Sequence, residues 1–214
     1  MKNIDIAVVD YGMGNLRSVS KALEHVAPNQ TVVVTSDPQL IHEATRVVFP
    51  GQGAMPDCIR ELDLRGLRQV VTEATQNKPF LGICIGLQML FERSEEGQAA
   101  GLGIFAGEVK RFAAEDMHDA HGQKLKVPHM GWSQVQQSMP HAMWQSIPEQ
   151  DRFYFVHSYY VVPQDATMIA GTTHYPQPFT CAIAKDNLFA VQFHPEKSAQ
   201  AGLQLLSNFV HWQP

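Results

Sequence analysis

The stretch PFLGICIGLQ, residues 79–88, decides the fold that this sequence predicts. An apolar run of strand length ends at Ile83, and Cys84 follows with one glycine two residues before it and another two residues after it. Glycines at these places remove Cβ atoms that would clash in a sharp turn between a strand and a helix. The pattern therefore predicts a strand–nucleophile–helix turn with Cys84 at its tip.

The predicted turn places Cys84 where a reactive thiolate and a tetrahedral oxyanion would both be stabilised. At a helix N-terminus, unpaired backbone N–H groups and the helix dipole favour a thiolate, and the N–H of Ile85 can donate to a tetrahedral oxyanion. Gln88 follows one helical turn later on the same side, where its amide can hydrogen-bond a bound substrate. The alternative is a buried structural cysteine with a surface glutamine. Cys58 and Cys181 lack this context and are interpreted as structural.

The first half of the chain alternates strand-like and helix-like segments. Apolar runs rich in Val, Ile and Phe predict the strands, and helical periodicity or composition predicts the helices between them. The predicted strands are residues 4–9, 31–35, 46–49 and 79–83, and the predicted helices are residues 15–26, 62–76 and 85–92. This alternation predicts an α/β fold with an open, largely parallel sheet and helices on both faces.

The second half has shorter runs with frequent Gly, Pro and His. It predicts strands at residues 127–135, 153–162, 168–172, 180–184 and 188–193, and a closing helix at residues 199–212. Short strands joined by turns form antiparallel pairs, so the predicted sheet is mixed. No repeat, low-complexity tract or long linker divides the sequence, and we expect a single domain over residues 1–214.

The composition argues against several classes of protein. Hydrophobic residues make up 44% of the 214 residues, enough for a continuous core, and the net charge of −5 argues against nucleic-acid or anionic-membrane binding. Three scattered cysteines argue against a disulfide framework. The first ten residues lack the apolar core of a signal peptide, and no apolar run has membrane-spanning length. We therefore expect a cytoplasmic protein.

The segment HPE at residues 194–196 supplies a candidate base. The predicted strand at residues 188–193 ends directly before it, and open α/β sheets place their sites at such strand ends. The proline stiffens the segment, so Glu196 can accept from the His194 ring and hold the tautomer that takes the Cys84 proton. Alone, HPE is also the sequence of a surface turn. Together with the predicted elbow it favours a Cys–His–Glu triad.

A glycine-rich turn, PGQG at residues 50–53, follows the predicted strand at residues 46–49. Backbone N–H groups in such a turn can aim at a substrate oxygen. Gly51 and Gln52 are therefore candidate donors of an oxyanion hole, although the same letters also describe an ordinary turn.

Two other patterns point away from cofactors and metals. YGMGN at residues 11–15 lacks the full GxGxxG fingerprint of a dinucleotide loop. His118 and His121 lack further ligands of matching geometry for a metal site, and a solvated loop is the simpler interpretation. We expect neither a cofactor nor a metal ion.

The PGQG, GICIGLQ and HPE motifs together resemble those of the class I, triad-type glutamine amidotransferases, in order and spacing, across nearly the whole chain. The resemblance implies that Cys84 attacks the side-chain amide of L-glutamine, that His194 protonates the leaving ammonia and later activates water, and that Glu196 orients His194. It also implies a substrate site with Gln88 and with backbone groups of two further residues, Ser158 and Tyr159.

Three other segments resemble one branch of this family: YGMGNLRS at residues 11–18, PHMGW at 128–132 and FYFVHSY at 153–159. In that branch the glutaminase forms a heterodimer with a cyclase subunit, a (β/α)8 barrel, and works well only when docked to it. The cyclase uses the ammonia in L-histidine biosynthesis to make imidazole glycerol phosphate and an aminoimidazole carboxamide ribotide.

The same resemblance places Trp132 at the interface with the cyclase as an anchor, which suits an exposed tryptophan. A core aromatic is the alternative. Asn15 and Arg17 are expected to face the partner as well.

Two other functions stay open from the sequence. The triad also suits a stand-alone thiol hydrolase acting on γ-glutamyl or peptide substrates, although the chain has no long substrate-binding insertion. A non-catalytic binding module on the same fold is the second alternative, and the complete triad argues against it.

Overall fold

The computed structural model describes residues 4–113, 115, 117–118 and 122–214. The strands are β1 (Ile6–Val9), β2 (Val32–Thr35), β3 (Arg46–Gly51), β4 (Phe80–Cys84), β5 (Phe91–Ser94), β6 (Phe105–Arg111), β7 (His129–Gln134), β8 (Gln136–Gln137), β9 (Arg152–His157), β10 (Tyr159–Pro163), β11 (Ile169–His174), β12 (Pro178–Lys185) and β13 (Leu188–Val191). The α-helices are α1 (Leu16–Val26), α2 (Pro38–Glu43), α3 (Met55–Leu64), α4 (Arg68–Asn77), α5 (Ile85–Gln88) and α6 (Ala199–His211). Short 3₁₀ helices include η5 (Pro195–Lys197).

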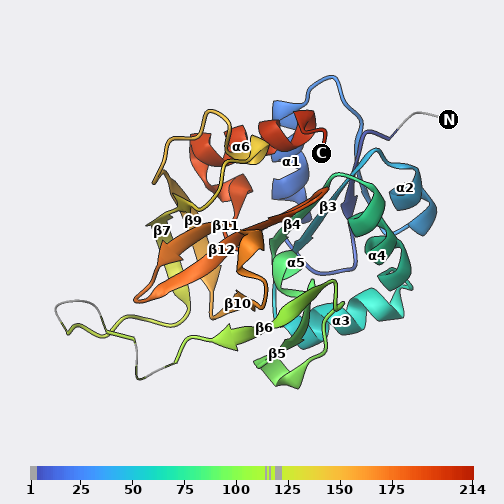
Figure 1. Cartoon of the computed structure of the whole chain (residues 1–214). Coiled ribbons are helices and arrows are strands. Elements are labelled where there is room, and N and C mark those ends of the chain that lie inside the picture. Colours follow the sequence, from blue (N-terminus) through green and yellow to red (C-terminus); the bar gives the residue numbers. More distant parts are fainter. Residues whose placement is uncertain (1–3, 114, 116, 119–121) are drawn as a thin grey trace.

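One large sheet forms the centre of the molecule (Figure 1). Its strand order is β2-β1-β3-β4-β13-β12-β10-β6-β5. Off this path, β11 pairs with β12, and β8 pairs with β11. The strands from β2 to β13 run parallel, and β12, β10 and β6 continue the sheet in antiparallel pairs. Strands β7 and β9 form a separate antiparallel pair. The predicted α/β fold with an open, mixed sheet is confirmed.

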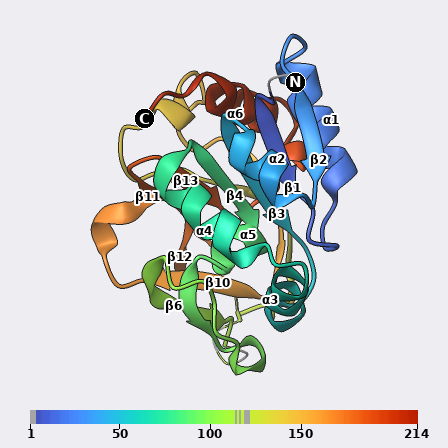
Figure 2. The ribbon, with the colours of Figure 1, turned by 90° about the vertical axis from the view of Figure 1, so that its right-hand side faces the viewer.

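Helices cover both faces of the parallel part of the sheet. Helices α1 and α6 pack against each other on one face, and α2 and α4 pack against each other on the opposite face (Figures 1 and 2). Strands β1, β3, β4 and β13 are accordingly buried along their whole length, which explains their continuous apolar sequences.

Three predicted elements differ from the structure. The helix predicted at residues 85–92 ends at Gln88, because the buried Phe91 starts a strand that pairs with β6. The helix predicted at 62–76 is the end of α3 and all of α4, separated at Gly66, whose φ is +66°. The strand predicted at 153–162 is β9 and β10, which belong to different sheets.

The parallel strands bring the three predicted motifs to one edge of the sheet. Strands β3, β4 and β13 are neighbours, with Gly51 opposite Cys84 and Val191 opposite Ile83. Their carboxyl ends therefore lie side by side, as expected for a site in an open α/β sheet. Gly51 of the glycine-rich turn is the last residue of β3, Cys84 is the last residue of β4, and the segment that leads to His194 follows β13.

Gly82 and Gly86 are required by close packing rather than by positive φ. A Cβ on Gly82 would lie 2.9 Å from the Cβ of Ala190, and a Cβ on Gly86 would overlap the carbonyl oxygen of Phe49. Phe49 lies on β3, so the glycine lets the short helix α5 cross directly over the neighbouring strand.

We predict that Gly86→Ala lowers the free energy of unfolding by about 3 kcal/mol, because a rigid backbone carbonyl blocks the added methyl group. Denaturant unfolding measures this change. Gly66→Asn is the matched control, because Gly66 has open space around it and asparagine tolerates positive φ. Equal stability of Gly86→Ala and the wild type would contradict the packing explanation.

Candidate active site

Cys84 occupies a strained position at the tip of the strand–helix turn. Its φ of 57° and ψ of −109° fall outside the regions that non-glycine residues normally adopt. Such strain persists only where the surrounding packing enforces it, and it is typical of functional sites. The helix that follows, α5, is a single turn of four residues, much shorter than predicted.

His194 lies between Glu196 and Cys84. Its Nδ1 atom is 3.0 Å from Oε1 of Glu196, and both side chains are almost fully buried. The Nε2 atom is also buried and meets no hydrogen-bond geometry with any described residue. Its interaction with the nearby Cys84 thiol is therefore an electrostatic contact rather than a formed hydrogen bond.

The surroundings of His194 favour its charged form. Burial lowers the pKa of the imidazole, but the interactions with the Cys84 sulfur and then with the Glu196 carboxylate outweigh burial and raise the pKa to about 10. An imidazolium beside the sulfur is the arrangement that stabilises a thiolate nucleophile.

Strand β9 holds the backbone of the HPE segment in place. The N–H of His194 donates to the carbonyl of Tyr154 at 2.9 Å. The hydroxyl of Ser198 donates to the carbonyl of His194 at 2.6 Å and accepts from the N–H of Tyr154 at 2.9 Å. The imidazole is thus positioned by three backbone-directed hydrogen bonds in addition to its bond with Glu196.

A cavity of about 380 Å³ opens beside the sulfur of Cys84. The structure brings most of the predicted site residues to its wall: Gln52, Cys84, Ile85, Gln88, Ser158, Tyr159 and His194. Two other predicted residues, Gly51 and Glu196, do not line the cavity but contact residues that do. Gly51 is buried in β3 opposite Cys84, and Glu196 contacts the far side of the His194 ring.

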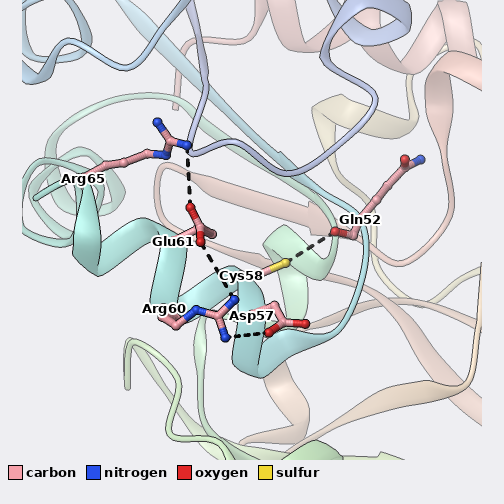
Figure 3. Close-up of polar contacts among 6 residues, drawn as sticks. All are labelled: Gln52, Asp57, Cys58, Arg60, Glu61 and Arg65. Atoms are coloured by element: carbon pink, nitrogen blue, oxygen red, sulfur yellow. Dashed lines mark hydrogen bonds and ion pairs between the residues drawn. The ribbon is translucent and has the colours of Figure 1, made fainter.

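Cys58 connects helix α3 to the end of β3 and the following Gln52, the segment with the predicted oxyanion donors Gly51 and Gln52 (the oxyanion strand). The Cys58 thiol donates to the carbonyl oxygen of Gln52, with 3.4 Å between sulfur and oxygen (Figure 3). Burial raises the pKa of this thiol to about 11, so it keeps the proton that it donates. On the other side of the same helix, Arg60 pairs with Asp57 and Glu61. Cys58 is buried, as expected of a structural cysteine, and its contact with the oxyanion strand is a finding of the structure.

Gln88 is buried, so the alternative of a surface glutamine is wrong. Its Nε2 donates to the carbonyl of Tyr159 at 3.1 Å and to Oε1 of Gln192 at 3.0 Å. Its own Oε1 is buried and has no partner in the described part of the chain. Gln192, which sequence reasoning missed, directs its Nε2 at the Cys84 sulfur, 3.7 Å away. The only signal in the sequence was a polar residue at the end of a buried strand.

A buried pair of histidines lies next to this group and was also missed. Nδ1 of His129 is 3.1 Å from Nε2 of His157, and Nδ1 of His157 is 2.7 Å from the carbonyl oxygen of Tyr159. Burial lowers the pKa of His129 to about 4 and that of His157 to about 3, so both rings are neutral. The sequence shows the two histidines on predicted strands but not that these strands pair.

The three residues predicted at a partner interface lie outside the cavity wall. Trp132 on β7 is 50% exposed, and its ring contacts Tyr154 edge-on, with 6.0 Å between ring centroids. It is therefore not a core aromatic. Met130 on the same strand is 63% exposed. Asn15 is half-buried directly before α1, and Arg17 is exposed on its first turn.

The metal site considered for His118 and His121 cannot be followed in full, because His121 lies outside the described residues. Among the residues that the structure does describe, no group of three or more His, Cys, Asp or Glu side chains has the arrangement of a metal site.

Comparison with known proteins identifies the class of this chain. Residues 7–212 match the family model described as glutamine amidotransferase class-I. The chain belongs to this family.

Individual relatives give a finer resemblance. The chain is 66% identical over 212 residues to imidazole glycerol phosphate synthase subunit HisH of Thiobacillus denitrificans, covering 99% of this chain and 93% of the relative. It is 67% identical over 210 residues to the subunit of the same name from Nitrosospira multiformis, covering 98% and 99%. The resemblance to this branch of the family, which rested on three short segments, is confirmed.

Solved structures share the fold at much lower identity. A putative GMP synthase subunit from Thermoplasma acidophilum has a TM-score of 0.67 at 18% identity, covering 99% of this chain and 94% of that one. One protein chain in the structure of PurLQS from Thermotoga maritima has a TM-score of 0.67 at 16% identity, covering 98% and 99%. In the described part of the chain, no helix is long and apolar enough to cross a membrane.

The neutral histidine pair predicts that acid destabilises the fold. In the unfolded chain both histidines titrate near pH 6.5, but in the folded chain they stay neutral down to about pH 4 and pH 3. The unfolded state therefore binds more protons as the pH falls below 6.5. Below pH 6.5 each histidine therefore lowers the free energy of unfolding by about 1.4 kcal/mol per pH unit, and above pH 6.5 it lowers it by nothing.

Denaturant unfolding of the wild type and of His157→Gln between pH 7 and pH 4 tests this pH dependence. The slope of the free energy of unfolding against pH should be smaller in the variant by about 1.4 kcal/mol per pH unit, which corresponds to one proton. His174→Gln, on an exposed side chain of β11, is the control and should keep the wild-type slope. Parallel pH profiles for the wild type and His157→Gln would show that His157 titrates normally in the fold.

Proposed function

We propose that the chain is the glutaminase subunit of an imidazole glycerol phosphate synthase, and that Cys84, His194 and Glu196 form its catalytic triad. The observation that supports this most is the position of His194, whose ring contacts Glu196 on one side and the strained, cavity-facing Cys84 on the other. The identity of 66–67% to HisH subunits over nearly the whole chain supports the choice of substrate.

The first half of the proposed reaction forms a thioester. The Cys84 thiolate attacks the side-chain amide carbon of L-glutamine, and the carbonyl electron pair moves onto oxygen. The backbone N–H of Ile85 and those of the oxyanion strand, at Gly51 and Gln52, stabilise this oxyanion. When the intermediate collapses, the carbon–nitrogen bond breaks, His194 gives its proton to the nitrogen, and ammonia leaves.

The second half releases glutamate. His194, now neutral, takes a proton from water, and the resulting hydroxide attacks the thioester carbon. The carbon–sulfur bond breaks, glutamate leaves, and the proton on His194 again stabilises the Cys84 thiolate. Glu196 keeps the ring in one orientation through both steps, because its hydrogen bond fixes Nδ1 as the donor and leaves Nε2 to exchange protons with the reactants.

Substrate binding is proposed for three residues of the cavity wall. The buried and unpartnered Oε1 of Gln88 is suited to accept a hydrogen bond from glutamine. Ser158 and Tyr159 line the same cavity and are placed at the amino-acid end of the substrate. The Tyr159 carbonyl is already engaged by Gln88 and His157, so other backbone atoms there would contact the ligand.

The proposed partner is the (β/α)8-barrel cyclase subunit of the synthase, to which the ammonia passes. Trp132 and Met130 supply an exposed apolar surface on β7, adjacent to Pro128 at the cavity wall. An aromatic anchor beside the site suits a heterodimer in which ammonia travels directly between subunits. Asn15 and Arg17 are proposed as further contacts.

The cytoplasm is the proposed compartment, where reducing conditions keep the free thiol of Cys84 active.

A stand-alone thiol hydrolase is the second candidate, because it would use the same triad without a partner. Steady-state glutaminase assays with and without the cyclase subunit separate the two functions. Stimulation by the cyclase and its nucleotide ligand supports the synthase, whereas full activity of the chain alone with no stimulation would exclude channelling. Binding without any hydrolysis in either assay would instead support a non-catalytic module.

We predict that Cys84→Ala abolishes glutamine-dependent synthesis by the complex and leaves ammonia-dependent synthesis largely intact, because only the first requires the thiol. Both rates are measured on the same purified complex. Cys181→Ala, which removes a buried thiol on β12, is the control and should retain both activities. Glutamine hydrolysis that survives in Cys84→Ala would show that another group is the nucleophile.

We also predict that Trp132→Ala weakens binding to the cyclase subunit by roughly 2 kcal/mol, about thirtyfold in Kd, because a half-exposed tryptophan is a typical interface anchor. Isothermal titration calorimetry measures the difference. Leu64→Ala removes an exposed apolar side chain from α3 and should bind as the wild type does. An unchanged Kd in Trp132→Ala would place the interface elsewhere.

A further inference from the structure

We propose that Gln192 is a catalytic residue that donates a hydrogen bond from its side-chain amide to the Cys84 sulfur, and that a chain of hydrogen bonds, whose direction is set by the backbone carbonyl of Tyr159, fixes the amide in this orientation. The inference rests on the proposed function, because it assigns Gln192 a role toward the same nucleophile. Gln192 is fully buried, and its Nε2 is 3.7 Å from the Cys84 sulfur.

The backbone carbonyl of Tyr159 sets the direction of every hydrogen bond in this chain of hydrogen bonds. A carbonyl oxygen can only accept hydrogen bonds, and it has two lone pairs to do so. Here it faces Nε2 of Gln88 at 3.1 Å and Nδ1 of His157 at 2.7 Å. Both of these nitrogen atoms must therefore be donors. This settles the side-chain amide orientation of Gln88 and the tautomer of His157 from a fixed backbone atom.

The orientation of Gln88 then determines that of Gln192. One hydrogen of the Gln88 amide goes to Tyr159, and the other goes to Oε1 of Gln192 at 3.0 Å. Because Oε1 of Gln192 accepts this bond, its Nε2 is the atom that faces Cys84. Rotating the Gln192 amide by half a turn would place two donors against each other and an oxygen lone pair against the sulfur. In a fully buried site that exchange is costly.

The histidine pair lies on the other side of the Tyr159 carbonyl in this chain of hydrogen bonds. With Nδ1 of His157 as donor, a neutral ring has Nε2 as acceptor, and Nδ1 of His129 donates to it at 3.1 Å. Nε2 of His129 then accepts from the hydroxyl of Ser133 at 2.9 Å. Burial keeps both rings neutral by lowering their pKa values. Each atom that takes part in the chain from Ser133 to Gln192 therefore has one defined role, as donor or as acceptor.

The result is a hydrogen-bond donor for the nucleophile, in addition to the electrostatic contact with the imidazolium of His194. Hydrogen bonds to a charged group are about twice as strong as neutral ones, so a donor that faces the sulfur favours the thiolate over the thiol. The titratable groups coupled to the Cys84 sulfur from the surrounding elements are His194, Tyr11 in the loop after β1 and Cys58 on α3. Burial raises the pKa of both Tyr11 and Cys58, so these two groups keep their protons. The Gln192 amide stabilises negative charge on the sulfur without titrating itself.

The first test measures how fast iodoacetamide alkylates Cys84 in the full chain, since only the thiolate reacts. Gln192→Met preserves the length of the side chain and removes the donor. We expect its alkylation rate near pH 7 to fall roughly tenfold, with the pH–rate profile displaced to higher pH. Gln136→Met, on an exposed side chain of β8, is the control and should match the wild type. A rate for folded Gln192→Met within twofold of the wild type would overturn the proposal.

A second measurement uses the wild-type fold and therefore does not depend on the stability of Gln192→Met. In the ¹⁵N-labelled chain, the Gln192 side-chain N–H resonances should change with pH along the same curve as Cys84 alkylation, and this change should vanish in Cys84→Ser. Resonances that ignore both the pH and Cys84→Ser would mean that the amide does not contact the sulfur.

Peptide mapping of the alkylated wild type separates this inference from the proposed function. Preferential labelling of Cys84 over Cys58 and Cys181 is expected if Cys84 is the nucleophile. Absence of that preference would count against the proposed function itself. Preferential labelling together with an unaltered Gln192→Met rate would leave the function standing and remove only the role of Gln192.

Discussion

The approach of helix α5 to strand β3 at Gly86 is the constraint on which the site depends. Because Gly86 has no Cβ, α5 can pass directly over the Phe49 carbonyl. This close approach requires a sharp turn between β4 and α5. Cys84 takes up that turn in a strained backbone conformation. Cys84 is thereby placed at the end of β4, between the ends of β3 and β13, where Gly51 and the segment leading to His194 lie.

Unsatisfied polar atoms mark the same place. Protein interiors seldom leave such atoms without partners, because each costs a desolvation penalty. In the described chain, three of the five buried side-chain atoms without a partner are Nε2 of His194, Oε2 of Glu196 and Oε1 of Gln88. His194 and Gln88 line the cavity beside Cys84. A polar ligand with both donors and acceptors, as an amide has, would satisfy atoms that the fold leaves open, whereas an apolar ligand would not.

The parts of the site that local spacing encodes could be predicted from the sequence, and the parts that depend on strand pairing could not. Gly-x-Cys-x-Gly and HPE each describe a backbone geometry within a few residues, so Cys84 and His194 were found. Gln192 was missed because its partner Gln88 is far away in sequence. The helix predicted through Phe91 failed for a related reason, since pairing with β6 overrides local helical preference.

Strand β9 connects the exposed surface at Trp132 to both groups that face the sulfur. Its residue Tyr154 contacts the Trp132 ring and holds the backbone of His194, while His157 at its end donates to the Tyr159 carbonyl that orients Gln88 and, through it, Gln192. β9 pairs with β7 in a sheet of two strands, and its side chains Phe153 and Phe155 are buried in the core. One strand therefore contacts the Trp132 ring and also positions the groups that face the sulfur.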